Sequence, residues 1–484
     1  MASQAVDCNA LEATTSIEDI TGNEHNRDIL RALQNDELTE LWLSTGGDYE
    51  LGSSRDLGWL GHFAKKSTSL EMVGIYGDDT FRNCSGHSVD RFLGDLGQCN
   101  HIKKMHFQDT NLAEIVYKLG PAMKNSRRTH FFVVGCHLGV PEATFLFNTF
   151  RDMNSLEELC IECDGNLANL NDGDMAGYIP SLAACAGMRD LKLSYLNLST
   201  NSCAALRGVF PWMANLRELA LCGNSLDDDC TRLLAQGLSD CKQLQSLDLS
   251  DNRISDDGLD MLVQGLPANV DTLTLVMNDI ALARHVLLLR FKELNLLGNS
   301  LCPSGTGVIA ASLTNSESRL EDLDLDHCDI GVDGTATLAE GLRNNQRLTR
   351  MSLGDNNITE RGRNAFSSIL CDTSSIEATY NSNHTLQSLG NFEIPKDVRL
   401  MLRLNKEKNK SRVAANKILQ AHRHLDMRPL FGRELGLLPY MVAWLEHFAK
   451  SRLHFKLSSI FEFVRAMPMK VVDGVVGKAK GESR

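Results

Sequence analysis

The 484-residue chain lacks the segments that mark membrane and secreted proteins. It has no run of 18 or more apolar residues, so we expect no membrane-spanning helix. Its first seven residues, MASQAVD, contain neither a basic region nor an apolar run, and we therefore expect no signal peptide. The fourteen cysteines are scattered rather than arranged as a compact disulfide framework, which favours reduced thiols. Together these features predict a protein of the cytoplasm or the nucleus.

Familiar catalytic and metal-binding motifs are also missing. The sequence contains no phosphate-binding GxxxxGKS or GxxxxGKT loop, no GxSxG, no HExxH and no EF-hand loop. Cys160 and Cys163 form a lone CxxC with no second pair at zinc-like spacing, so a metal site is not expected. Cys371 has no evident base nearby in the sequence. We therefore expect no catalytic residue, no metal and no cofactor.

Charge is divided unevenly along the chain, whose net charge is −13. Residues 391–484 hold 19 Lys and Arg against 9 Asp and Glu, a net +10, whereas residues 1–390 hold 30 against 53, a net −23. An acidic body argues against nucleic acid as its ligand. The basic segment predicts contact with an acidic surface, either on another molecule or on the body of this chain.

What the chain does contain is one pattern repeated thirteen times. The clearest copy, Leu244–Ile254 (LQSLDLSDNRI), fits the leucine-rich repeat template L-x-x-L-x-L-x-x-N/C-x-L at every fixed position. Successive copies start 21 to 32 residues apart, a spacing that a random leucine-rich helical protein would not hold over so many residues. The copies begin at Leu38, Leu70, Ile102, Arg128, Leu156, Met188, Leu216, Leu244, Val270, Phe291, Leu320, Leu348 and Ile376.

Each copy predicts a short strand followed by an inward turn. In the clearest copy, Leu247 and Leu249 alternate with outward-facing polar residues and should face the core. Asn252 stands where the chain turns inward, and its amide is expected to bond the turn backbone and to stack as a ladder. The same position is occupied in other copies by Asn224, Asn278, Asn299, Asn356, Cys136 and Cys328.

The segment that returns from each strand to the next is predicted to be helical. Apolar residues three and four apart indicate helices over 226–238, 254–266 and 330–342, each with a late Gly that suits a helix C-terminus. One repeat cannot bury its own apolar faces, so stacked neighbours must cover them. We therefore predict an α/β fold: a leucine-rich repeat solenoid (horseshoe) with a parallel sheet on the concave face, helices on the convex face and a small C-terminal helical region.

A strand followed by a long helix in each repeat resembles the ribonuclease-inhibitor-like class of leucine-rich repeat proteins. The resemblance covers roughly residues 38–390. It implies an intracellular binding module. Some members of the class are ligand-sensing arms of receptors, some bind enzymes, and one branch activates the small GTPase Ran.

Four segments are predicted along the chain. They are a polar cap over 1–37 with a short helix at 26–34, a solenoid of about 13 repeats over 38–390, a basic helical region over 391–470 and a disordered tail over 471–484. Polar insertions at 46–55 and 77–86 are either tolerated loop drift or partner-binding loops. The ninth repeat is short, and residues 281–290 replace its helix.

Beyond the repeats, residues 398–425 predict one long charged helix that ends before Pro429 and Gly432. A second helix is expected over 440–450, and a third carries an apolar stripe from Leu457 to Val464. These helices either cap the last repeat as a small bundle or dock a partner.

The outward strand positions form the candidate binding surface. The early repeats offer aromatic residues, which commonly anchor interfaces, whereas the later ones form an acidic patch centred on Asp322, Asp324 and Asp326. Like charges this close need an offset, either from water and counterions or from a basic partner or the basic tail. The predicted partner-binding residues are Trp42, Tyr76, His106, Phe132, Glu162, Tyr195, Asp248, Glu293, Asp322, Asp324, Asp326 and Arg350. Outward positions in repeats five to seven also carry Glu158, Asp190, Lys192 and Glu218.

These features predict a non-catalytic protein–protein interaction module or scaffold that binds a basic protein surface on its concave face. The alternative is a regulator of a small GTPase resembling the Ran GTPase-activating proteins, although those carry a strongly acidic stretch behind the repeats where this chain is basic. A detached sensor arm of an immune-type receptor is a further alternative. Another is a scaffold held at the cytoskeleton or a membrane by the basic tail, which has no lipidation motif.

Overall fold

The computed structural model describes residues 8–45, 49–123, 127–163, 168–284, 288–391 and 393–422. The chain forms two compact units. Unit 1 comprises Met1–Val308 and Ser318–Asp329, and unit 2 comprises Ile309–Glu317 and Ile330–Arg484. The helices predicted over 440–450 and around Leu457, and the tail predicted over 471–484, lie outside the described residues.

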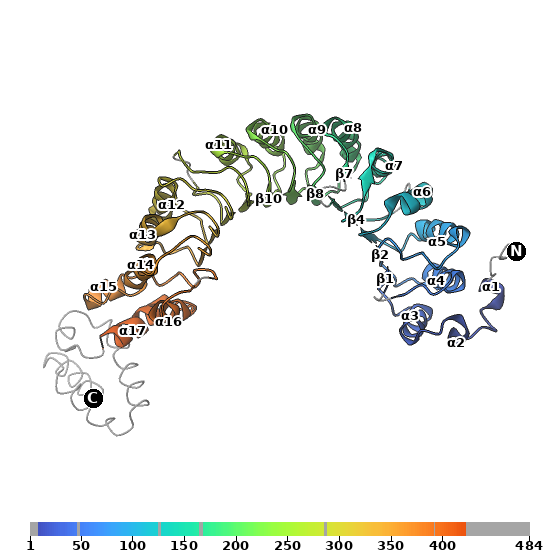
Figure 1. Ribbon diagram of the computed structural model, residues 1–484, viewed down its shortest axis with the longest axis horizontal. Coiled ribbons are helices and arrows are strands. Elements are labelled where there is room, and N and C mark those ends of the chain that lie inside the picture. The colour runs from blue at the N-terminus through green and yellow to red at the C-terminus, as the bar shows by residue number, and fades with distance from the viewer. Residues whose placement is uncertain are drawn as a thin grey trace, which may run out of the picture. The chain divides into compact units, whose positions relative to one another are not determined.

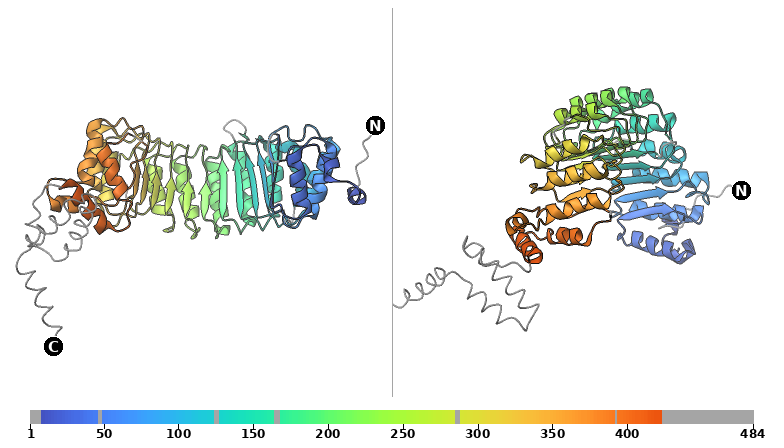
Figure 2. Two further views of the ribbon diagram at one scale, coloured as in Figure 1. Left: turned by 90° about the horizontal axis from the view of Figure 1, so that it is seen from below. Right: turned by 60° about the vertical axis from the view of Figure 1, so that its left-hand side comes forward.

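Unit 1 is built on parallel strands that follow one another across the sheet in chain order. Figures 1 and 2 show these strands on the inner side of the unit and its helices on the outer side. This arrangement confirms the leucine-rich repeat solenoid and its parallel sheet. The strands are β1 (Glu40–Ser44), β2 (Met72–Tyr76), β3 (Lys104–Gln108), β4 (His130–Val134), β6 (Glu158–Glu162), β8 (Asp190–Ser194), β9 (Glu218–Ala220), β10 (Ser246–Asp248), β11 (Thr272–Thr274), β12 (Glu293–Asn295) and β13 (Asp322–Asp324), with β5 (Leu138–Gly139) and β7 (Ala168–Asn169) as a separate pair.

The helices of unit 1 begin where the return segments were predicted. α10 and α11 match the helices predicted over 226–238 and 254–266. The helices are α1 (Cys8–Leu11), α2 (Ile17–Ile20), α3 (Glu24–Gln34), α4 (Ser54–Lys66), α5 (Gly86–Gln98), α6 (Leu112–Met123), α7 (Val140–Phe150), α8 (Asp172–Tyr178), α9 (Thr200–Val209), α10 (Asp228–Leu238) and α11 (Asp256–Gly265), with the 3-10 turns η1 (Ile179–Ala184) and η2 (Phe210–Trp212); α12 spans Gly305–Thr314.

The core between the sheet and the helices is made by the inward template positions. Leu247 and Leu249 are 0% exposed, and Leu247 pairs in register with Leu219 and Leu273 on the neighbouring strands. Arg128 occupies a template leucine position and is also 0% exposed, because its Nη2 donates to the carbonyls of Leu96 (2.9 Å) and Gly97 (3.2 Å). Burial lowers the pKa of Arg128 to about 10.

The predicted asparagine ladder is present. Asn252 accepts from the Leu226 N–H (3.0 Å) and donates to the carbonyls of Leu221 (3.1 Å) and Leu249 (3.0 Å), so one amide bonds the turns of two repeats. Cys328 replaces the amide with a thiol that donates to the Leu296 carbonyl at 3.1 Å. The ladder therefore satisfies backbone groups that would otherwise be buried without partners.

The residue before each ladder position has left-handed backbone. Gly223 adopts this conformation (φ +61°) easily because it has no side chain. Tyr195 (φ +58°) and Met277 (φ +50°) adopt it as well. Each of these bulky side chains covers a glycine in the next repeat. A Cβ on Gly223 would lie 2.0 Å from the Tyr195 ring, and one on Gly298 would lie 3.0 Å from the Met277 Cγ.

The late helix glycines lie at the C-terminal ends of their helices, as predicted, but not as left-handed caps. Gly237 and Gly265 have no left-handed backbone and do not end their helices as C-caps. A Cβ on Gly237 would lie 2.8 Å from the Cα of Arg207, and one on Gly265 would lie 2.8 Å from the Cβ of Ala235. These glycines allow neighbouring helices to approach closely.

The first insertion is not a free loop. Tyr49 is 0% exposed, and its N–H donates to the Trp42 carbonyl (3.0 Å) while its carbonyl accepts from Ser44 (3.2 Å). Helix α3, two residues longer than predicted at its start, reaches this segment through Asn26, whose side chain donates to the Glu50 carbonyl (2.7 Å). In the ninth repeat the described parts of 281–290 contain no helix, as predicted.

Unit 2 contains α13 (Gly331–Leu342), β14 (Arg350–Ser352), α14 (Glu360–Leu370), α15 (Ile376–Tyr380), α16 (Lys396–Leu404) and α17 (Lys410–Ala421). The repeat predicted to start with a strand at Ile376 is wrong, because that segment is helix α15. The segment paired with β14 comes later, where the Met351 N–H donates to the Ser388 carbonyl at 3.0 Å.

The single helix predicted over 398–425 is also wrong. Helix α16 ends at Leu404, and α17 starts at Lys410. Asn405 is 0% exposed at the break, and its side chain donates to the Leu386 carbonyl at 2.6 Å. This tertiary hydrogen bond fixes the chain where local sequence favours helix continuation.

Candidate functional site: the inner strand surface of unit 1

The outward strand positions of unit 1 form rows that run across the sheet, because its parallel strands are paired in register. The middle row begins Trp42, Gly74, His106, Phe132 and continues through Cys160 to Lys192. A second row joins residues 40, 72, 104, 130, 158, 190 and 218, and neighbouring strands are about 4.8 Å apart. Figure 2 shows the strands side by side across the unit.

Three predicted residues come together as a continuous row of contacting rings, here called the aromatic platform: Trp42, His106 and Phe132. The Trp42 ring reaches across Gly74 to the His106 ring, with centroids 4.9 Å apart. His106 stacks on Phe132 at 5.2 Å and an interplanar angle of 26°. Glycine at the intervening position makes the Trp42–His106 contact possible.

The imidazole at the centre of the platform is poorly solvated. Its Nε2 is buried and has no hydrogen-bond partner in the described part of the chain. Burial lowers the pKa of His106, so the neutral ring is the stable form near neutral pH. The platform is therefore an uncharged, largely apolar surface.

The two predicted tyrosines flank this region at the ends of their strands. Tyr76 ends β2 and is 43% exposed. Tyr195 follows β8 and covers Gly223, and burial together with the nearby Asp251 raises its pKa. Both rings offer contact area, but neither is paired with the platform.

Beyond β4 the inner surface becomes acidic. Glu158, Asp190 and Glu218 occupy the same row on β6, β8 and β9, and we call them the acidic row. Burial and the neighbouring Glu158 carboxylate raise the pKa of Asp190. His130 lies at one end of the row, with its Nε2 3.3 Å from a Glu158 oxygen. The row is a line of like charges whose mutual repulsion an arriving cation would relieve.

The sequence assigned outward positions to Glu158, Asp190 and Glu218 but did not select them as site residues. The selected Glu162 lies on β6 in a different row, opposite Val134 and Ser194. The signal that could have identified them is that the three acids occupy the same template position in consecutive repeats. Because the strands pair in register, residues at one template position become neighbours across the sheet.

The later acidic residues are only partly brought together. Glu293 and Asp322 are paired in register on β12 and β13. Asp248 and Asp324 share a local role, because each accepts a backbone N–H two residues on: Ser250 at 3.0 Å and Asp326 at 3.0 Å. One carboxylate oxygen of each is therefore used to close the strand end.

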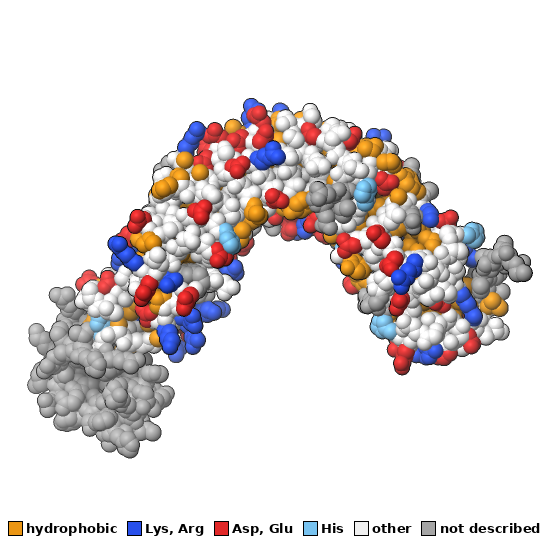
Figure 3. All heavy atoms as spheres, in the orientation of Figure 1, with side chains coloured by type: hydrophobic (Ala, Val, Ile, Leu, Met, Phe, Trp, Pro, Cys, Tyr) orange, Lys and Arg blue, Asp and Glu red, His pale blue; other side chains and the backbone are white. Residues whose placement is uncertain are grey.

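Arg350 and the basic C-terminal region belong to unit 2. Arg350 starts β14, where it forms a bridge with Ser388. The expected contact between the basic tail and Asp322, Asp324 and Asp326 stays a prediction. Figure 3 shows Lys and Arg side chains gathered over α16, where Lys396, Arg399 and Arg403 are exposed.

Among the described residues there is no cluster of three or more His, Cys, Asp or Glu side chains able to hold a metal ion. Cys160 and Cys163 are buried, and burial raises the pKa of Cys160 to about 11. All fourteen cysteines are free thiols. No described helix is both long enough and apolar enough to cross a bilayer.

Comparison with known proteins shows that these repeats are similar to leucine-rich repeats of other proteins. A Leucine Rich Repeat family model matches residues 243–264. The chain is 29% identical to the ribonuclease inhibitor of Mus musculus and 27% identical to that of Sus scrofa, each over 246 residues. In both cases the match covers 49% of this chain and 47% of the relative, so the chain spans about half the length of the curated relatives it matches.

Solved structures show more distant likeness. An internalin from Listeria monocytogenes aligns over 79% of this chain and 98% of its own, with 14% identity and a TM-score of 0.43. The fold assignment rests on the strand register, the asparagine ladder and the matched repeats. The chain is built from leucine-rich repeats and is similar to the ribonuclease inhibitors over the matched half.

Proposed function

We propose that this protein is a non-catalytic interaction module that binds a protein with a basic surface on the inner strand surface of unit 1. The observation that carries the proposal is the in-register acidic row beside the aromatic platform. An aromatic anchor and a line of carboxylates match a partner that presents an apolar side chain next to Lys or Arg.

Three features support a protein partner. The surface is an extended sheet face rather than an enclosed cavity, as suits a macromolecule. Its charge on β6 to β9 is negative, which disfavours a polyanion such as nucleic acid. The outer side differs, since Figure 3 shows acidic and basic side chains intermixed over α10 and α11, with Asp229 paired to Arg232.

Each part of the surface has a separate task in this proposal. The platform supplies contact area at little entropic cost, because its rings already pack against one another. The acidic row selects and steers a basic partner, and this contribution weakens with salt. A small GTPase among the bound proteins would redirect the proposal toward the regulator alternative.

The test is affinity capture from a cell lysate with matched charge reversals. Glu158→Lys with Glu218→Lys changes the acidic row, whereas Asp240→Lys with Asp260→Lys makes the same charge change at exposed outer positions. We expect the wild type and the outer variant to capture a common protein that the acidic-row variant loses. That protein should elute as salt rises from 0.1 to 0.5 M.

Identical captured proteins from all three chains would overturn the proposal. A second variant, Trp42→Ala with Phe132→Ala, tests the platform without changing charge. It should weaken capture while leaving the salt dependence in place. Circular dichroism of each variant verifies that the repeats remain folded.

A further inference from the structure

Unit 2 contains a polar cavity of about 480 Å³ that is unrelated to the inner strand surface of unit 1. Three segments line it: residues 343–346 after α13, residues 380–385 after α15, and Lys410, Ser411 and Ala414 at the start of α17. None of the described lining residues is acidic. The lining consists mainly of amides, hydroxyls and cationic side chains.

Buried hydrogen bonds hold the walls of the cavity. Asn345 donates to the Leu313 carbonyl (2.8 Å), and Asn383 donates to the carbonyls of Leu342 (2.8 Å) and Asn345 (2.9 Å). Asn383 Oδ1 accepts from the N–H groups of Thr385 and Leu386, each at 2.9 Å. The cavity is therefore preformed rather than assembled by a ligand.

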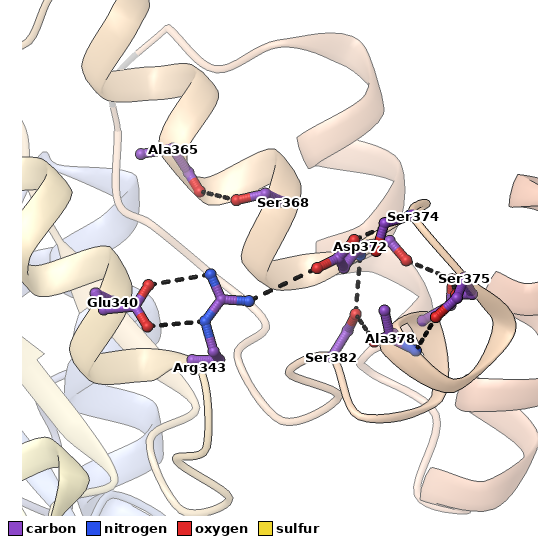
Figure 4. Close-up of polar contacts among 10 residues, drawn as sticks. Glu340, Arg343, Ala365, Ser368, Asp372, Ser374, Ser375, Ala378 and Ser382 are labelled. Carbon is purple, nitrogen blue, oxygen red and sulfur yellow. Dashed lines mark hydrogen bonds and ion pairs between the residues drawn. The ribbon is translucent and has the colours of Figure 1, made fainter.

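One cation at the rim is already compensated. Figure 4 shows Arg343 between Glu340 and Asp372, with Ser382 close to Asp372. The Arg343 guanidinium makes two hydrogen bonds to Glu340, at 2.9 and 3.0 Å, and lies 3.8 Å from a carboxylate oxygen of Asp372. Glu340 raises the pKa of Arg343. Its position is fixed, and its charge is largely neutralised.

Two lysines of α17 form no such salt bridge with a described residue: Lys410, which lines the cavity and lies near Glu407, and Lys417, which lies outside the lining. Lys410 Nζ donates to the carbonyls of Asn405 (2.7 Å) and Glu407 (3.1 Å), and Lys417 Nζ donates to those of Leu370 and Asn383 (both 2.7 Å). Neither ammonium has an ion-pair partner among the described residues, although Lys417 is 0% exposed. Burial lowers the pKa of both lysines, that of Lys417 to about 7.

His384 lies on the cavity wall between these lysines and Tyr380. Its Nε2 is 2.9 Å from the Tyr380 carbonyl, so this nitrogen carries the proton. Its Nδ1 is buried and has no hydrogen-bond partner among the residues that the structure describes. Burial and the charges of Lys417 and Lys410 lower the pKa of His384 to about 4. A negative ligand in the cavity would oppose the charges of the two lysines and so raise the pKa of His384.

Other donors around the cavity have no internal role. The side chains of Asn344, Asn381 and Ser411 have no hydrogen-bond partner within the described residues, and Asn344 and Asn381 offer amide N–H groups. At the start of the twelve-residue helix α17, Asn409 accepts the Arg412 N–H at 3.1 Å, and the N–H groups of Lys410 and Ser411 need partners from outside the helix. The preformed walls, the Lys410 ammonium without a salt bridge and the available donors all favour an oxyanion.

We propose that this unit 2 cavity binds a phosphate group, with Lys410, Ser411 and the start of α17 as its main contacts. Phosphate suits an ammonium point charge and the N–H groups of a helix start. The group could belong to a small phosphate ester or to a phosphorylated side chain of another protein, since the chemistry of the contact is the same.

Isothermal titration of the full chain with inorganic phosphate tests the proposal. Sodium chloride at equal ionic strength separates specific binding from general screening. We expect saturable binding of phosphate that chloride does not reproduce. O-phosphoserine and a phosphoserine peptide are then compared. Tighter binding of the peptide assigns the site to a protein partner, and tighter binding of O-phosphoserine assigns it to a small ester.

Two variants locate the site. Lys410→Gln removes the ammonium charge, and Ser411→Glu places a carboxylate in the first turn of α17, where a helix tolerates it well. Each should weaken phosphate binding at least tenfold, while Lys406→Gln, at an exposed position outside the lining, should not. Ser411→Glu guards against loss of structure in Lys410→Gln, whose side chain also holds the preceding turn. A response to phosphate no different from chloride, or equal binding by all variants, would overturn the proposal.

Discussion

The indole of Trp42 lies over Gly74 so closely that a Cβ on Gly74 would stand 2.2 Å from the ring. Gly74 is in register with Trp42 on one side and with His106 on the other, and the tryptophan crosses it to reach the histidine. The absence of one side chain thus links two residues that lie on strands separated by a third.

Replacing Gly74 with alanine should displace the indole. We expect Gly74→Ala to lower the free energy of unfolding by about 1–3 kcal/mol, as overpacking does, and to weaken binding at the aromatic platform. Chemical denaturation and tryptophan fluorescence measure the two effects. Gly58→Ala is the matched control, since nothing lies within 4 Å of its added Cβ, and it should leave stability unchanged or raised. Equal effects of the two substitutions would contradict this account.

Removing a rung of the asparagine ladder should be costly. Asn252→Ala leaves the Leu226 N–H and the Leu221 and Leu249 carbonyls without the amide that bonds them. We expect a loss of about 3 kcal/mol in urea denaturation, from several buried polar groups left unsatisfied. Asn269→Ala removes a single exposed bond to the Lys242 carbonyl and should cost about 1 kcal/mol or less. A small effect at Asn252 would mean that water replaces the amide.

The acidic row should carry a stability penalty at neutral pH. The raised pKa of Asp190 means that the folded state binds its proton more tightly than the unfolded state, so stability is lost as pH rises through the folded pKa. Asp190→Asn should therefore raise the free energy of unfolding by a few tenths to about 1 kcal/mol at pH 7. The gain should vanish below the unfolded pKa of about 4, where the carboxyl is protonated in both states. Asp240→Asn, at an exposed outer position, should show neither effect in thermal or chemical unfolding.

Lys417 should link stability to pH in the opposite direction. Burial holds its pKa at about 7, with Cys371 and Lys410 as the neighbouring ionisable groups, whereas an unfolded lysine titrates near 10.4. Between these values the unfolded state binds more protons, so stability rises with pH. The wild type should gain about 2 kcal/mol relative to Lys417→Met between pH 7 and pH 9. Lys406→Met is the exposed control, and parallel pH profiles for wild type and Lys417→Met would sink the prediction.

Much of the fold could be predicted because the same template recurs many times along the chain. Leu247, Leu249 and Asn252 occupy template positions whose burial follows from strand alternation, and the structure places them as expected. The errors concern the last predicted copy of the template, which has no following copy to confirm its position. The weak match at Ile376 is a helix, and the paired segment is at Ser388, because tertiary contacts of Asn383 and Asn405 determine the chain path there.

The site was only partly predictable for a related reason. Each outward position was read correctly from its own repeat, but contacts between positions depend on register and on side-chain reach. Trp42 reaches His106 only because Gly74 is small, and the acidic row needs Glu158, Asp190 and Glu218 at one template position. The cavity of unit 2 joins three segments that share no periodicity, so no pattern in the sequence pointed to it.

At two left-handed sites, a bulky side chain in one repeat packs over a glycine at the equivalent position of the next repeat. Tyr195 is tolerated because Gly223 follows one repeat later, and Met277 because Gly298 does. A repeat of this chain is therefore not an interchangeable module. Deleting the repeat that contains Gly223 would bring Tyr195 next to Asp251, and deleting the repeat that contains Gly298 would bring Met277 next to His327, so each of these two pairs of repeats should be kept together in engineering.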